Sequence, residues 1–140
     1  MTAKLLIRIS AILILVHLLG HSAGHIGWDK SEDPKMNEVV NVMKGYSAEF
    51  MGATKSMADY YVGYSYIMFG LFGMSILLLW MLSNHTTTNQ KLVKQLLYPI
   101  GVSYLFFGLT EYVYFFPFAA IISLIAGLCA LFATFKLTQT

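Results

Sequence analysis

The chain has 140 residues, of which 57% are hydrophobic and only 11% charged, with a formal net charge of +2. An ordinary soluble domain carries roughly 25% charged residues, so this composition excludes one and indicates a membrane protein. The single cysteine, Cys129, excludes a disulfide within the chain.

Four apolar blocks are long enough to cross a bilayer, because one crossing takes about 20 residues. They cover residues 5–27, 60–82, 96–116 and 118–135. We therefore expect an all-α integral membrane four-helix bundle that forms a single domain over residues 1–140.

Lys4 and Arg8 precede the apolar run of the first block, so the block also resembles a secretory signal. Cleavage after Ala23 would place the bulky His21 where a signal peptidase requires a small side chain. We therefore expect this block to remain in the protein as a membrane-spanning helix.

The segment 28–59 is the only sizeable polar part, and it is expected outside the cell membrane. Asp33 before Pro34 is typical of a helix start, and apolar residues then recur at helical spacing. These features predict a short amphipathic helix from about Pro34 to Gly45 on the outer membrane surface. "SMAD" at 56–59 has the form of a capping box and predicts the start of the second span.

The third and fourth spans are separated only by "FFPF" around Pro117, which predicts a tight antiparallel hairpin. If the chain spans four times, the basic residues that flank the spans all fall on one side, and this side is expected to be the cytoplasm. Both termini are then cytoplasmic, and all seven acidic residues lie in the other half. The five flanking basic residues are Lys4, Arg8, Lys91, Lys94 and Lys136.

Three histidines in the first span, His17, His21 and His25, are spaced by four and share one helix face. Glycines border this face and recur at helical spacing on the second and third spans. Small residues in such stripes let membrane helices approach closely, so we expect them at helix contacts. They are Gly20, Gly24, Gly63, Gly70, Gly73, Gly101 and Gly108.

Glu111 lies inside the third span, where an acidic residue costs about 2.5 to 3.5 kcal/mol on insertion scales and usually faces a partner. Counting from the span ends places it at the depth of His21, so His21 and His25 are its expected partners. Together these polar residues predict a pocket in the outer half of the bundle. Its expected lining is His17, His21, His25, Asp59, Tyr66 and Glu111.

Three uses of this pocket are open. The histidines can be hydrogen-bond glue between helices, worth about 0.6 kcal/mol each. Alternatively, His21, His25 and Glu111 can hold a divalent metal such as zinc, or the pocket can bind a lipophilic small molecule or a lipid headgroup. Haem is disfavoured because the remaining histidine, His85, lies in the inner loop.

No catalytic residues emerge from the sequence, because the outer-half serines, Ser22 and Ser56, lie off the main polar face. Nothing resembles a nucleotide-binding loop or a nucleic-acid surface. The expected partners are the lipid bilayer and either a lipophilic ligand or another membrane protein. In the latter case the protein is an accessory or scaffold subunit whose histidines only join helices.

"HLLGHSAGHIGW" and "MGATKSMADYYVGYSY" resemble a family of small four-span bacterial membrane proteins without an established activity, similar in general build to DoxX-like proteins. The resemblance covers the first two spans and their linker, and the last two spans only in general character. It implies a four-helix bundle in the bacterial inner membrane. It implies no redox role.

Overall fold

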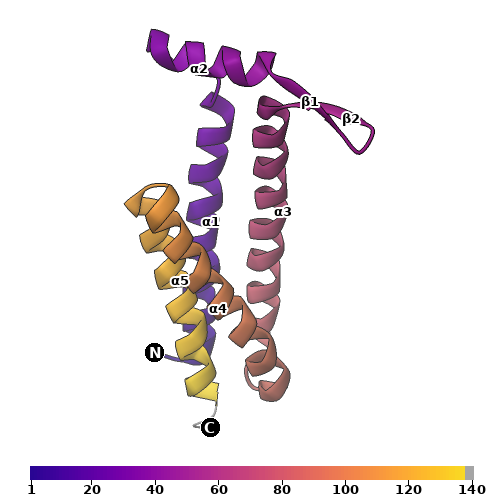
Figure 1. Cartoon of the computed structure of the whole chain (residues 1–140). Coiled ribbons are helices and arrows are strands. Elements are labelled where there is room, and N and C mark those ends of the chain that lie inside the picture. Colours follow the sequence, from indigo (N-terminus) through magenta and orange to yellow (C-terminus); the bar gives the residue numbers. More distant parts are fainter. Residues whose placement is uncertain (138–140) are drawn as a thin grey trace. The chain divides into compact units, whose positions relative to one another are not determined.

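A computed structural model describes residues 1–137 of the chain (Figure 1). Four of its helices are long and apolar enough to cross a membrane, which confirms the helical fold class and the four predicted spans. Each of the four differs from its predicted bounds by a few residues at most, except that the third begins six residues earlier. The elements are α1 (Ala3–Gly27), α2 (Pro34–Gly45), β1 (Ser47–Phe50), β2 (Ala53–Ser56), α3 (Met57–Asn84), α4 (Gln90–Tyr114) and α5 (Pro117–Leu137).

The predicted helix starts are present with their capping bonds. The Asp33 side chain accepts a hydrogen bond of 2.9 Å from the Lys35 backbone N–H at the start of α2. At the start of α3, Ser56 Oγ accepts from the Asp59 N–H, and Asp59 Oδ2 accepts from the Ser56 N–H at 2.8 Å. This reciprocal pair is a capping box with aspartate in place of glutamate.

The β1–β2 hairpin was not predicted from the sequence. Its strands are antiparallel, with Ser47 opposite Ser56 and Phe50 opposite Ala53. Met51 and Gly52 join the strands with φ values of 50° and 80°. Positive φ at both central residues is the requirement of a type I′ turn, whose twist matches that of the strands. The sequence predicted no secondary structure for residues 47–55.

Contacts divide the chain into two compact units. The first unit comprises Met1–Leu18 and Phe72–Thr140, and the second comprises Leu19–Leu71. Helices α1 and α3 each contribute residues to both units. The single domain expected from the sequence stays a prediction, and each unit is described by itself below.

In the first unit, α4 and α5 pack against each other as an antiparallel pair (Figure 1). A Cβ atom added at Gly101 would lie 2.7 Å from Leu131 Cγ, and one at Gly108 would lie 2.6 Å from Leu124 Cγ. Because the two glycines have no Cβ atom, the backbones of α4 and α5 can approach closely. Helix α1 joins this pair through Ser10, whose hydroxyl donates to the Ala126 carbonyl at 2.9 Å.

The other predicted packing glycines have open space beside them. A Cβ atom added at any one of them would meet no atom within 4 Å in the described part of the chain. Their role in helix contacts therefore stays a prediction. They are Gly20, Gly24, Gly63, Gly70 and Gly73.

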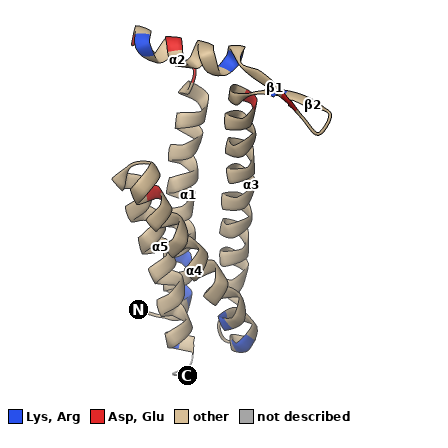
Figure 2. Ribbon diagram, in the orientation of Figure 1, with Lys and Arg blue, Asp and Glu red and all other residues tan. Residues whose placement is uncertain are grey.

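Basic side chains of the first unit lie in the half that holds the start of α1, the α3–α4 link and the end of α5 (Figure 2). Arg8 ties the start of α1 to the end of α3. Its Nε donates to Ser83 Oγ at 3.3 Å, and its guanidinium lies 4.9 Å from the centre of the Trp80 ring. The basic residues thus share one end of the unit, while the assignment of that end to the cytoplasm stays a prediction.

Candidate functional site

A buried polar cluster in the first unit joins three helices. It consists of His17 on α1, Glu111 on α4 and Ser123 on α5. His17 Nδ1 is 3.1 Å from Ser123 Oγ, and His17 Nε2 is 3.5 Å from Glu111 Oε1. The imidazole therefore bridges a hydroxyl and a carboxyl group. We call these three residues the His17 cluster.

Apolar aromatic rings border the His17 cluster. The Phe72 ring lies 4.6 Å from the His17 ring, centre to centre, and 6.5 Å from the Tyr104 ring. Phe72 and Tyr104 are both almost fully buried. Because water is largely excluded here, hydrogen bonds are electrostatically stronger than at a surface, and an unmet polar group is more costly.

Glu111 is the only acidic residue that is buried among residues 1–137. Its side chain and that of His17 are each 11% exposed. Glu111 Oε1 faces His17, but Oε2 is buried without a hydrogen-bond partner in the described chain. A buried acceptor left unmet costs about 1 to 3 kcal/mol. Glu111 Oε2 can therefore accept a hydrogen bond from one further donor.

In the second unit, His21 and His25 lie against α3. His21 Nε2 is 3.0 Å from Ser65 Oγ, and the His21 ring makes an edge contact with Phe69 at 5.2 Å. The His25 ring contacts both Phe69 and Tyr66, at 5.2 and 5.1 Å. These two histidines are thus held by aromatic rings and one serine.

The six residues of the predicted pocket divide between the units. His17 and Glu111 meet in the first unit, and His25 and Tyr66 meet in the second. Asp59 caps α3, and it lines a cavity in the second unit together with Tyr66. A single pocket that combines all six residues stays a prediction.

The histidine that contacts Glu111 in the first unit is His17, although the sequence favoured His21 and His25. Depth was counted from the span ends, which assumes that the helices end at one level. Glu111 lies three residues before the end of α4, whereas His17 lies ten residues before the end of α1. The contact between them shows that counting from helix ends does not give depth here.

The predicted metal ligands His21, His25 and Glu111 receive no support from the structure. Within residues 1–137, no group of three or more His, Cys, Asp or Glu side chains is placed to hold a metal ion. The contacts of His21 and His25 include a hydroxyl and aromatic rings, which are not metal ligands in this arrangement. A zinc site remains only a prediction from spacing.

Two serines that hydrogen-bond to histidines were missed as functional residues. Neither Ser123, which contacts His17, nor Ser65, which contacts His21, is among the predicted pocket residues. Ser123 lies between Ala119 and Gly127 at intervals of four, on the buried face of α5. A hydroxyl on a face of small residues is the signal that marks it, because such a face adjoins another helix.

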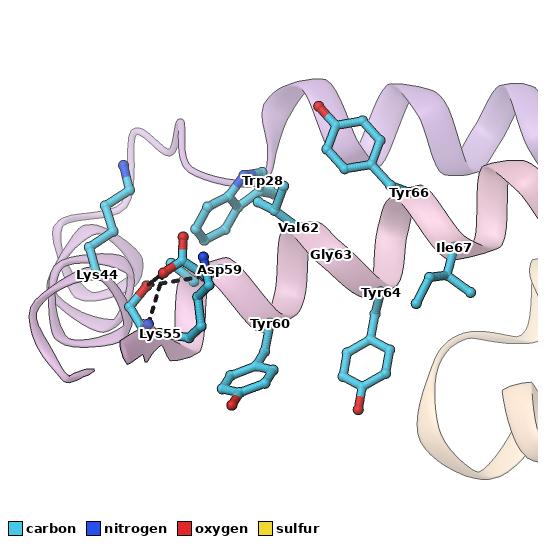
Figure 3. Close-up of a pocket in the computed structure, with 12 residues that line it drawn as sticks. Trp28, Lys44, Lys55, Asp59, Tyr60, Val62, Gly63, Tyr64, Tyr66 and Ile67 are labelled. Atoms are coloured by element: carbon cyan, nitrogen blue, oxygen red, sulfur yellow. Dashed lines mark hydrogen bonds between the residues drawn. The ribbon is translucent and has the colours of Figure 1, made fainter. Parts of the chain in front are cut away.

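A separate cavity of about 800 Å³ lies in the second unit at the start of α3 (Figure 3). It is bordered by aromatic residues of α3, by the link after α1, by α2 and by β2. Its lining residues include two lysines, Lys44 and Lys55, and one aspartate, Asp59. None of them belongs to the His17 cluster.

Four membrane-length apolar helices and a buried ionisable pair between them define a multi-pass membrane protein. No family model, curated protein or solved structure matches the chain. The resemblance to small four-span bacterial proteins therefore stays a prediction.

Proposed function

We propose that the protein is a multi-pass protein of the bacterial inner membrane that binds a lipophilic small molecule at the His17 cluster. The ligand carries a hydroxyl or amine donor. The observation that carries this proposal is the buried Oε2 atom of Glu111, an acceptor without a partner in the described chain. Ionisable residues inside membrane spans usually mark functional sites.

The donor requirement follows from the chemistry of the cluster. His17 already faces Ser123 through Nδ1 and Glu111 through Nε2. Glu111 Oε2 is the buried oxygen of the cluster that no hydrogen bond in the described chain uses, so it can accept from a further donor. The lipophilic requirement follows from the surroundings, because the cluster lies between apolar spans and a ligand would reach it from the bilayer.

His17 would couple the ligand to a proton. The neutral imidazole has one donor and one acceptor nitrogen, and the protonated ring has two donors. A proton delivered to the cluster therefore strengthens the contact with Glu111 and turns His17 into a donor toward Ser123. Pure structural glue does not require an acceptor that is left unmet, which is why we favour ligand binding.

A long-chain alcohol that carries a photoactivatable diazirine tests the proposal in the full-length protein. Labelling of α1, α4 or α5 beside the cluster is expected in the parent. It should persist in Glu111→Gln, whose amide oxygen still accepts, and should fall in Glu111→Leu. Equal labelling of the Leu variant and the parent would reject the site.

Two further variants guard against a simple loss of folding. Ser123→Ala removes the hydroxyl beside His17 without added bulk, and it should weaken labelling. Ser10→Ala is the matched control, because Ser10 is also a buried serine of the first unit but bonds to a backbone carbonyl away from the cluster. It should label like the parent.

A second function, as an accessory subunit of a membrane complex, is favoured by one observation. Five glycines on α1 and α3 have open space where a Cβ atom would stand, so another helix can approach there. Purification from detergent extracts would distinguish the two functions. For an accessory subunit, Gly24→Leu should lose a co-purifying partner protein, while its diazirine labelling should equal that of the parent.

A further inference from the structure

The cavity in the second unit combines an aromatic wall with charges of both signs. Its lining includes Tyr60 and Tyr64 on one side of α3, Tyr66 on the other side, and Trp28 from the link after α1 (Figure 3). Lys44 of α2 and Lys55 of β2 stand at the polar side, and Asp59 lies at the start of α3. The remaining lining residues are small or apolar.

The cavity stands at the level of lipid headgroups. Helix α3 is long enough to span a membrane, and it begins at Met57. Its first turns are therefore at an end of the span, where tyrosine and tryptophan are enriched because their rings are apolar and their polar tips reach water. Tyr60 and Tyr64 project from one side of α3 and are substantially exposed.

Lys44 is held in place rather than left free in solvent. Its Nζ donates to Asp29 Oδ2 at 2.9 Å and lies 5.6 Å from the centre of the Trp28 ring. The ammonium is thus kept beside the aromatic wall, where it retains donors for a second acceptor. This arrangement brings a positioned cation to the cavity.

Asp59 brings a fixed negative charge to the same cavity. Its Oδ2 accepts from the N–H and the hydroxyl of Ser56, at 2.8 and 2.9 Å. These capping bonds orient the carboxylate, and none of them uses Oδ1. An anionic group in a cavity that tyrosines also line favours an ammonium ion, which is attracted by the charge and by aromatic rings.

We propose that this cavity binds the headgroup of a zwitterionic phospholipid. The phosphate is bound by Lys44 and Lys55, and the ammonium is bound by Asp59 and the tyrosine rings. With Asp29 bonded to Lys44, two carboxylates and two ammonium groups lie at or beside the cavity, and this balance suits a zwitterion better than an ion of one sign. The acyl chains would lie along Val62 and Ile67 in the direction of the span.

Tryptophan fluorescence of the full-length protein in detergent tests this assignment. Trp80 is replaced by phenylalanine, so that Trp28 alone reports on the cavity. A short-chain phosphatidylethanolamine should change the Trp28 emission saturably. A short-chain phosphatidylglycerol, which lacks the ammonium, should bind roughly tenfold more weakly because a charge-assisted contact is lost.

Variants of the charged residues locate the binding. Lys55→Gln should weaken phosphatidylethanolamine binding roughly tenfold. Asp59→Asn keeps a side-chain oxygen for the α3 cap and should remove the preference for the ammonium lipid. Lys35→Gln is the control, because Lys35 is an exposed lysine that lies outside the cavity lining, on the α2 helix that also carries Lys44. It should bind like the parent.

The outcomes are distinct. Equal binding of both lipids, or no effect of Lys55→Gln and Asp59→Asn, would overturn the proposal. Free phosphoethanolamine that binds as tightly as the lipid would support the same chemistry with a soluble source. Glu111→Leu should leave the Trp28 response unchanged, so failure at the His17 cluster and failure at this cavity are separable.

Discussion

His17 and Glu111 place an imidazole and a carboxyl group 3.5 Å apart on different helices, α1 and α4, in the first unit. The distance is longer than an ideal charge-assisted hydrogen bond of about 2.7 to 2.9 Å. The pair is therefore in contact without being tightly bonded. Such a loose contact leaves the carboxyl group able to accept from another donor.

The first prediction is that His17 and Glu111 are energetically coupled. His17→Leu and Glu111→Leu should each lower the free energy of unfolding in detergent by about 1 to 3 kcal/mol, because each leaves a buried polar partner unmet. The double variant should be less destabilised than the sum of the two. Neighbouring residues typically couple by about 0.5 to 3 kcal/mol, and additive effects would show that the two side chains do not interact.

The second prediction separates close-packed glycines from open ones. Gly108→Ala should destabilise by about 1 to 3 kcal/mol, because its Cβ atom would lie 2.6 Å from Leu124 Cγ and 3.0 Å from the Ala120 carbonyl oxygen. Gly70→Ala should be neutral or stabilising, since its Cβ atom meets nothing within 4 Å in the described chain. Thermal unfolding in detergent measures both. A large loss at Gly70 would contradict the open space beside it and indicate a helix contact at that position.

The third prediction concerns the turn of the β1–β2 hairpin. Met51 adopts a left-handed conformation with φ of 50°, which costs a non-glycine residue roughly 1 to 2 kcal/mol. Met51→Asn should relieve part of this cost and create Asn-Gly, the preferred type I′ pair. Amide hydrogen exchange over residues 47–56 should slow. Met51→Val should accelerate it, and a faster exchange in the Asn variant would contradict the turn assignment.

The fourth prediction is a pH dependence of the segment that follows α1. The hydrogen bond from Lys44 lowers the pKa of the Asp29 carboxyl below its ordinary value of about 3.9. Because the folded pKa is the lower one, the contribution to stability is present above the ordinary value and is lost as pH falls through the folded pKa. Trp28 fluorescence should therefore change on acidification below about pH 4.

Asp29→Asn is the variant that tests this dependence. It removes the titrating group, so the acid-induced change in Trp28 fluorescence should disappear or become much smaller. Glu32→Gln is the control, because Glu32 is a nearby exposed residue, whereas the carboxyl that bonds to Lys44 is that of Asp29. This variant should retain the acid-induced change in Trp28 fluorescence. An unaltered acid transition in the Asn variant would assign the change to another group.

The fifth prediction is the membrane orientation. In a Cys129→Ala background, a cysteine at Ser31 should react with an impermeant thiol reagent in intact cells, and one at Thr87 should not. The reason is that the basic residues of the first unit share the end that holds residues 85–89. Labelling at Thr87 alone would invert the topology.

Local signals in the sequence predicted the helix ends well. Asp33 with Pro34, and Ser56 with Asp59, act through atoms within three residues of each other, so pattern and structure coincide. The short link at Pro117 likewise leaves few geometries other than an antiparallel hairpin. Apolar length predicted the four spans, because the cost of unmet backbone groups in lipid admits little besides helices.

Features that depend on helix rotation and offset were not predictable in the same way. The contact of His17 with Glu111 depends on how far α1 slides along α4, which no residue spacing within one helix encodes. Ser123 joins the cluster only because the glycines of α4 bring α5 close. The β1–β2 hairpin was missed because its strands are only four residues long and lack clear alternation.

The two-residue link between α4 and α5 has a consequence for biogenesis. Helices joined this closely enter the membrane together, and their glycine contacts can form at once because they are local in the chain. Glu111 travels with this hairpin, while the imidazole it contacts is on α1, which precedes the hairpin in the chain and is synthesised earlier. The carboxyl group therefore gains that contact only when the hairpin docks against α1. A hairpin that docks on the wrong side keeps an unsatisfied acid in lipid, so the same residue that makes insertion costly also makes correct assembly selective.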